Sequence, residues 1–175
     1  MLDRRHLLMG SAALFALAMQ SKNGEAQTMA ATDTVPADTA TTNFAALSED
    51  DWKKRLNDQQ FYVLRKQGTE RPGTSPLNHE KRKGTFACAG CDLPLFSSDT
   101  KFESGTGWPS FYQPLPDAVA TTTDRSFFMS RTEVHCKRCS GHLGHVFDDG
   151  PRPTGLRYCM NGVALTFAPA APGAA

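Results

Sequence analysis

The sequence predicts a mostly β domain with short helices at its N-terminal edge and a structural zinc ion. Three observations support this fold class. Short segments of alternating polarity end in Gly, Pro or Asp-Gly, helix signals are confined to residues 48–73, and two Cys-x-x-Cys pairs resemble zinc ligands. The 175 residues suffice for one domain with tails. The net charge of +1 offers no basic excess for neutralising phosphates, so we expect no nucleic-acid partner.

Residues 1–30 read as an export signal. Arg4 and Arg5 precede an apolar stretch from Leu7 to about Met19, and Ala16-Leu17-Ala18 is one possible cleavage site. Paired arginines before an apolar run resemble a twin-arginine signal, which carries folded proteins out of the bacterial cytoplasm. The expected location is therefore periplasmic or otherwise exported. The alternative is an uncleaved anchor, although the stretch is short for a bilayer span of about 20 residues. Residues 31–47 are expected to be a flexible linker.

The expected folded domain covers residues 48–168 and begins with a helical region. Ser48 is a hydroxyl N-cap, and the three acidic residues that follow it suit the positive end of a helix dipole. Trp52 and Leu56 are four residues apart, so they share one helix face. Gly68, Pro72 and Gly73 are expected to end the helical region.

Five segments after the helical region are strand candidates, because they are rich in β-branched or alternating residues between turn signals. They are residues 84–88, 118–123, 130–135, 143–147 and 157–167. The Ala-, Pro- and Gly-rich residues 169–175 are expected to form a disordered tail.

Four of the five cysteines form two Cys-x-x-Cys pairs, Cys88 with Cys91 and Cys136 with Cys139. Two such pairs can present four thiolates tetrahedrally to one zinc ion, which would add folding free energy to a small β domain. Disulfides are an alternative in an oxidising compartment, and a redox role for either pair is another. Folding before twin-arginine export favours zinc, since the metal would be loaded first.

Cys159 is the unpaired cysteine and the candidate nucleophile. On a strand, Arg157, Cys159 and Asn161 point to the same face. A guanidinium beside a thiol favours the reactive thiolate, and the Asn161 amide can orient a substrate by hydrogen bonds. The alternative is a buried, inert thiol on a polar strand face.

Two further segments contain candidate site residues. His142 and His145 are three residues apart, which suits acid chemistry or substrate positioning; structural histidines or metal ligands are the alternatives. Trp108 follows two glycines and precedes a proline, so its indole can form an apolar wall of a pocket. The alternative interpretation is that Trp108 is an ordinary core tryptophan.

Taken together, these segments resemble the B-type peptide-methionine (R)-S-oxide reductases over about residues 48–167. The matching segments, in family order, are Cys88-x-x-Cys91, Gly105 to Phe111, Cys136-x-x-Cys139, Gly141 to Pro151 and Arg157-Tyr158-Cys159-x-Asn161. The resemblance implies two antiparallel sheets in a partly open barrel, with N-terminal helices and one zinc ion on the four paired cysteines.

The resemblance also implies the roles of the site residues. Cys159 would be the nucleophile, and Trp108 would hold the S-methyl group of the substrate. The pocket would be lined by His142, His145, Asp149, Arg157 and Asn161, with the histidines on the sulfoxide side and Arg157 supporting the thiolate. The expected substrate is oxidised methionine in proteins or peptides.

The sequence departs from the family pattern at Thr106. Many members have a resolving cysteine there, but this chain has no sixth cysteine. The Cys159 sulfenic acid is therefore expected to be reduced by an external thiol, either a thioredoxin-like protein or a small dithiol.

We expect a monomer. Two other classes remain as alternatives: a zinc-ribbon-like binding module without catalysis, and an exported thiol-disulfide oxidoreductase using one Cys pair.

Overall fold

The structure, a computed structural model, describes residues 42–125 and 130–171. The predicted export signal, most of the linker and the end of the tail lie outside the described residues. Within the described part of the chain, no helix is long and apolar enough to cross a membrane. Ordered structure begins before Ser48, because the 3-10 helix η1 (Phe44–Ala46) buries Phe44 against the Trp52 ring at 5.9 Å.

Two short α-helices form the N-terminal edge of the domain. α2 (Glu49–Arg55) and α3 (Asp58–Lys66) each begin with a capping box, at Ser48 and Asn57 respectively. The expected helical region is therefore interrupted, because Leu56 is extended and Asn57 starts a new helix. α3 ends at Gln67, which takes the left-handed conformation.

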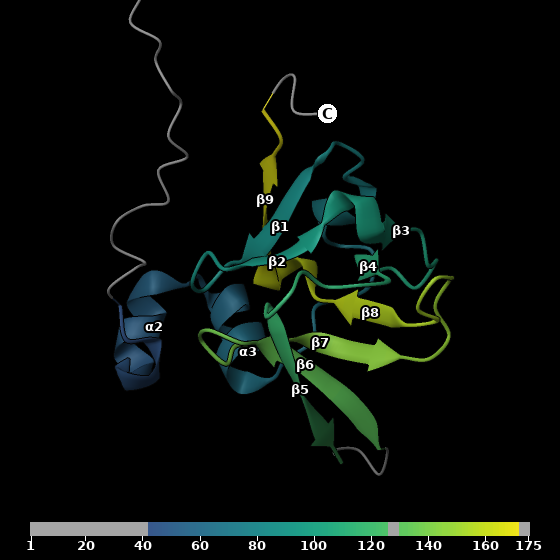
Figure 1. Cartoon of the computed structure of the whole chain (residues 1–175). Helices are drawn as coiled ribbons and strands as arrows, with labels where there is room; N and C mark the ends of the chain where they lie inside the picture. The colour runs from purple at the N-terminus through teal and green to yellow at the C-terminus, as the bar shows by residue number, and fades with distance from the viewer. Residues whose placement is uncertain (1–41, 126–129, 172–175) are drawn as a thin grey trace, which may run out of the picture. The chain divides into compact units, whose positions relative to one another are not determined.

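Nine strands form two antiparallel sheets in the described part of the chain (Figure 1). The smaller sheet has the order β2-β1-β9, and the larger has the order β3-β4-β8-β7-β6-β5. The strands are β1 (Gly84–Cys88), β2 (Pro94–Ser97), β3 (Lys101–Phe102), β4 (Ser110–Phe111), β5 (Val119–Asp124), β6 (Arg131–Cys136), β7 (His142–Phe147), β8 (Arg157–Met160) and β9 (Leu165–Pro169).

The predicted fold class is confirmed. The sheets are antiparallel, the helices are short, and the larger sheet does not close on itself because its edge strands β3 and β5 are not paired with each other. One strand candidate is corrected: residues 157–167 are not a single strand. β8 ends at Met160, the 3-10 helix η5 (Gly162–Ala164) follows, and β9 joins the other sheet.

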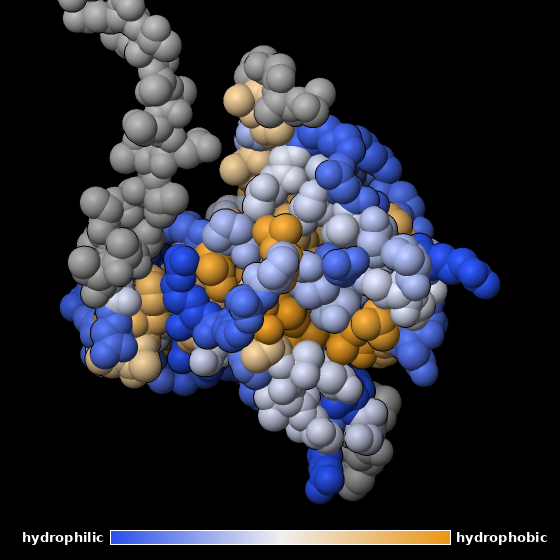
Figure 2. Space-filling view, in the orientation of Figure 1, coloured by the Kyte–Doolittle hydropathy of each residue, from blue (hydrophilic) through white to orange (hydrophobic). Residues whose placement is uncertain are grey.

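Aromatic packing joins the two sheets. Phe111 on β4 contacts Phe86 on β1 at 4.9 Å and Phe96 on β2 at 4.3 Å between ring centroids, and all three residues are fully buried. Such ring pairs add stability beyond the area that they bury. Figure 2 shows hydrophilic residues over much of one face of the molecule, with hydrophobic residues gathered near its middle.

Candidate active site

The four paired cysteines form one metal site. Their Sγ atoms all lie within 4.8 Å of one another, and all four residues are buried. The Sγ of Cys88 is 3.7 Å from that of Cys139, and the Sγ of Cys91 is 3.5 Å from that of Cys136. Tetrahedral Zn–S bonds of about 2.3 Å require sulfur atoms about 3.8 Å apart, so the cluster fits a structural zinc ion.

The two cysteine pairs are presented by the same kind of turn. The carbonyl oxygens of Cys88 and Cys136 accept hydrogen bonds from the amides of Asp92 (2.8 Å) and Ser140 (2.9 Å). Asp92 and Ser140 both have positive φ, at 56° and 55°. None of the four cysteines is in a disulfide. A zinc ion held by these residues would connect β1 of the smaller sheet with β6 of the larger sheet.

Cys159 lies in the middle of the larger sheet, where β8 is paired on both sides. Its Cα partners are Ser110 on β4 and His145 on β7. The residue is half-buried and lines a small pocket with a volume of about 130 Å³. The pocket is lined by Thr69, Trp108, Arg131, Gly144, His145, Phe147, Cys159 and Asn161.

Arg157 is fixed beside this pocket by Asp149. Its Nε and Nη2 donate to the two Asp149 carboxylate oxygens at 2.8 Å each, and its guanidinium lies 4.4 Å from the centre of the Phe147 ring. The Asp149 hydrogen bond raises the pKa of Arg157; burial opposes this shift, and the charge on Cys159 adds to it. The Asp149 side chain is 59% exposed and does not line the pocket, so the structure places it behind Arg157.

The two histidines are neighbours, with ring centroids 5.4 Å apart. His142 is buried and its Nδ1 lies 2.7 Å from a carboxylate oxygen of Glu133. Burial lowers the pKa of His142, and Glu133 partly opposes this shift. The Nε2 of His142 is also buried and has no hydrogen-bond partner among the described residues.

His145 lines the pocket, and its Nε2 lies 2.8 Å from Asp124 Oδ2, which also accepts from Arg131 Nη2 at 2.7 Å. The sequence interpretation did not select Asp124 or Glu133. In the sequence, Glu133 is marked only by its place on the same face as Arg131 in the alternating segment 130–135. The pairing of β5 with β6 and of β6 with β7 was needed to bring Asp124 and Glu133 to the histidines.

Asn161 and Trp108 are both held by residue 70. The Asn161 Oδ1 accepts from the Glu70 amide at 2.9 Å, and its Nδ2 donates to the Leu143 carbonyl at 3.0 Å. The indole Nε1 of Trp108 donates to the Glu70 carbonyl at 3.2 Å. Both Glu70 and the pocket residue Thr69 were missed by sequence reasoning, since they lie in a segment read only as the end of a helical region.

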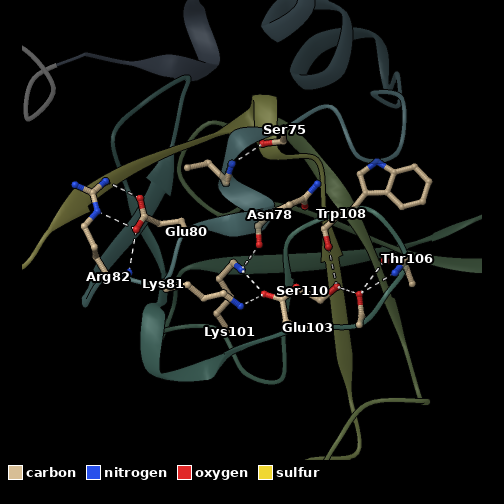
Figure 3. A network of polar contacts seen from close by, with 12 residues as sticks. Ser75, Asn78, Glu80, Lys81, Arg82, Lys101, Glu103, Thr106, Trp108 and Ser110 are labelled. Carbon is tan, nitrogen blue, oxygen red and sulfur yellow. Dashed lines mark hydrogen bonds and ion pairs between the residues drawn. The ribbon is translucent and has the colours of Figure 1, made fainter.

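The loop before Trp108 needs a glycine at position 107. Gly107 has a φ of 92°, and its carbonyl accepts from the Gly73 amide at 2.7 Å and the Asn78 Nδ2 at 2.8 Å. A Cβ there would lie 2.8 Å from the Cβ of Pro72. Figure 3 shows Trp108 next to Ser110 and Thr106, with Asn78 and Lys101 in the adjoining polar network.

A chain of hydroxyl groups leads to the Cys159 sulfur. Ser110 Oγ lies 2.7 Å from Ser104 Oγ, which lies 2.9 Å from Thr106 Oγ1. Thr106 Oγ1 is in turn 3.7 Å from Cys159 Sγ. Where the sequence resemblance leads one to expect a resolving cysteine, a threonine hydroxyl thus contacts the candidate nucleophile.

Comparison with known proteins shows the family. Residues 56–169 match the family model described as the SelR domain. A "Peptide methionine sulfoxide reductase MsrB" of Methanosarcina barkeri is 59% identical over 121 residues, covering 69% of this chain and 85% of the relative. Another of the same name from Pseudomonas putida is 58% identical, covering 69% of this chain and 91% of the relative.

A solved structure of a Mis18 "Yippee-like" domain is a more distant match, with a TM-score of 0.42 and 18% sequence identity. The match covers 51% of this chain and 99% of the Mis18 domain chain. The SelR match, the close relatives and the zinc cluster agree with the resemblance seen in the sequence. The chain belongs to the B-type peptide methionine sulfoxide reductases, a family of oxidoreductases.

Proposed function

We propose that this protein reduces the R epimer of methionine sulfoxide in peptides or proteins, with Cys159 as the nucleophile. The observation that carries the proposal is the pocket in which Cys159 lies beside aromatic side chains and His145. Trp108 and Phe147 provide apolar surface for an S-methyl group, while His145 provides a proton donor for the sulfoxide oxygen.

In the proposed reaction, the Cys159 thiolate attacks the sulfoxide sulfur and the oxygen is transferred to the cysteine. The sulfoxide is reduced to the thioether, and Cys159 is oxidised to the sulfenic acid, so one oxygen atom moves and two electrons move the other way. The oxygen is protonated as it leaves. We assign proton delivery to His145, which lines the pocket, and a supporting role to His142, which is buried and does not line it.

We further propose that an external thiol regenerates Cys159. The other four cysteines form the zinc cluster and Thr106 stands at the resolving position, so Cys159 has no intramolecular thiol partner. One thiol condenses with the sulfenic acid to a mixed disulfide and releases water; a second thiol then releases Cys159 and leaves as a disulfide. A thioredoxin-like protein or a small dithiol supplies both thiols.

The place of action is also a proposal. Arg4, Arg5 and the apolar stretch after them support twin-arginine export of the zinc-loaded, monomeric enzyme to the periplasm. The test is fractionation of cells that express the wild type and an Arg4→Lys, Arg5→Lys double variant. Periplasmic wild type and cytoplasmic variant support export, whereas equal distributions of the two contradict it.

The function is tested by stereoresolved turnover. Peptides with R or S methionine sulfoxide are incubated with dithiothreitol and either the wild type or Cys159→Ser, and zinc content is measured for both. We expect the wild type to reduce only the R epimer and the variant to be inactive with one zinc ion. Turnover by the variant would show that the nucleophile is misassigned. A zinc-loaded wild type that reduces neither epimer would contradict the proposed function.

A further inference from the structure

Glu70 lies where three parts of the active site meet. Its carboxylate accepts two backbone hydrogen bonds, from the amide of Gly162 at 2.6 Å and from the amide of Val163 at 2.9 Å. These are the first two residues of η5, which follows the strand that carries Cys159. Hydrogen bonds to an ionised acceptor are shorter and stronger than neutral ones. The carboxylate therefore fixes residue 70 to the chain directly after the nucleophile.

The backbone of Glu70 makes two further hydrogen bonds, and both reach pocket residues. Its amide donates to Asn161 Oδ1, and its carbonyl accepts from the Trp108 indole. The preceding residue, Thr69, lines the same pocket. One residue thus connects the Trp108 loop, Asn161 and the start of η5.

The segment that contains Glu70 and Ser75 approaches Gly162 so closely that position 162 has no room for a side chain. A Cβ at Gly162 would lie 2.0 Å from Ser75 Oγ and 3.3 Å from Glu70 Oε1, so the segment that contains Glu70 and Ser75 needs a glycine opposite it. Residues 67–72 contain no helix or strand. Because no regular hydrogen-bond ladder holds this segment, residue 70 is held by its own bonds: two at the carboxylate, and those of its backbone to Asn161 and Trp108.

We propose that Glu70 is a positioning residue for sulfoxide reduction. Its carboxylate holds the Glu70 backbone at the point where that backbone orients the Trp108 indole and the Asn161 amide. The inference rests on the proposed role of the Cys159 pocket, and it adds a residue outside the predicted site. Without the carboxylate, the backbone bonds to Trp108 and Asn161 lengthen, and the wall that binds the substrate methyl group loses its orientation.

The experiment compares Glu70→Ala and Glu70→Gln with Glu80→Gln. Glu80 is a suitable control because it is also half-buried and accepts a backbone amide bond, from Arg82 at 2.9 Å, but it does not line the pocket. Steady-state kinetics give kcat and KM for the R-sulfoxide peptide. The indole N–H signals of the two tryptophans are recorded by NMR, with Trp52 as the internal reference, and zinc content and Tm are measured for each variant.

We expect Glu70→Ala to lower kcat/KM by about 10- to 100-fold, chiefly through KM, as a small misplacement of positioning groups does. The Trp108 indole signal should shift and exchange faster with water, while the Trp52 signal stays in place. Glu70→Gln keeps one acceptor oxygen and should recover part of the loss. Glu80→Gln should keep wild-type kinetics.

The outcomes separate positioning from stability. If Glu70→Ala binds zinc, is folded at the assay temperature and keeps kcat/KM within about twofold of the wild type, the proposal is wrong. It is also wrong if Trp108 and Trp52 signals change together, because that indicates general loosening. If the wild type itself has no R-sulfoxide reductase activity while the Trp108 signal still responds to Glu70→Ala, the proposed function fails and the positioning contact stands.

Discussion

Thr106 Oγ1 lies 3.7 Å from Cys159 Sγ, so the side chain in contact with the candidate nucleophile is a hydroxyl and not a second thiol. The hydroxyl is held by Ser104, which is itself hydrogen-bonded to Ser110 on β4. Ser110 is also the Cα partner of Cys159 across the sheet. The position from which a second thiol would attack a sulfenic acid is therefore occupied by an ordered, unreactive hydroxyl.

Thr106→Cys is expected to create an intramolecular resolving cysteine. Since the native hydroxyl already contacts the sulfur, a thiol at this position should condense with the Cys159 sulfenic acid during the first turnover. Mass spectrometry without added reductant should then show a disulfide between the introduced thiol and Cys159 with zinc retained, where the wild type shows a sulfenic acid that dimedone traps. Ser104→Cys is the control, because the Ser104 hydroxyl reaches the sulfur only through Thr106. Dimedone trapping that is undiminished in Thr106→Cys would contradict the prediction.

Asp149→Asn tests how Arg157 is fixed. The substitution replaces the charged acceptor of two guanidinium hydrogen bonds, so Arg157 should become mobile beside Cys159 and kcat should fall. Stability should change little, because the Asp149 side chain is largely exposed. Kinetics and Tm are measured together, with Asp117→Asn as control, since its ion pair with Lys137 is exposed and neither residue lines the pocket. Unchanged kcat in Asp149→Asn would show that Arg157 needs no anchor.

Much of the site could be predicted from sequence because its chemistry belongs to short motifs. The spacing of Cys88, Cys91, Cys136 and Cys139 is readable along the chain, and the structure brings all four together. Strand β1 also runs from Gly84 to Cys88 as predicted. These features depend on local residue order, which a single sequence records.

The residues that sequence reasoning missed depend on contacts between distant segments. Glu70 is separated by 91 positions from Asn161, and Asp124 by 21 from His145, so nothing near either acid indicates its partner. The strands β3 and β4 have two residues each, too few to show an alternating pattern. The break between β8 and β9 follows from the tertiary contacts of Gly162, which local propensity does not contain.

Cys136→Ser is expected to remove zinc and unfold the domain. Structural zinc contributes about 10–16 kcal/mol in small zinc-binding peptides, which is as large as the whole stability of a typical domain at about 5–15 kcal/mol. Losing one of four ligands should therefore abolish the cooperative thermal transition. Circular dichroism and metal analysis give the result, and Cys159→Ser serves as the matched cysteine control that keeps zinc. A zinc-free Cys136→Ser protein with wild-type Tm would contradict a structural role for the metal.

Glu133→Gln is expected to lower the pKa of His142 further. Burial already holds this pKa below its usual value, and the Glu133 carboxylate is the main group that opposes burial. Because the folded-state pKa is depressed, the neutral histidine contributes its full stability above the unfolded value of about 6.5, and that stability is lost as the pH falls from there through the folded-state pKa. Without the carboxylate, the loss on acidification should be larger and extend to lower pH.

The measurement is an NMR titration of the His142 ring in the wild type and Glu133→Gln, over the pH range in which both retain zinc. Glu103→Gln is the control, because Glu103 is an exposed glutamate whose ion pairs are with Lys81 and Lys101 rather than with a histidine. The ring of His142 should titrate at lower pH in Glu133→Gln and at the wild-type pH in Glu103→Gln. An unchanged or raised value in Glu133→Gln would mean that the carboxylate does not favour the protonated ring, and that the bond between Glu133 and Nδ1 is not made in solution.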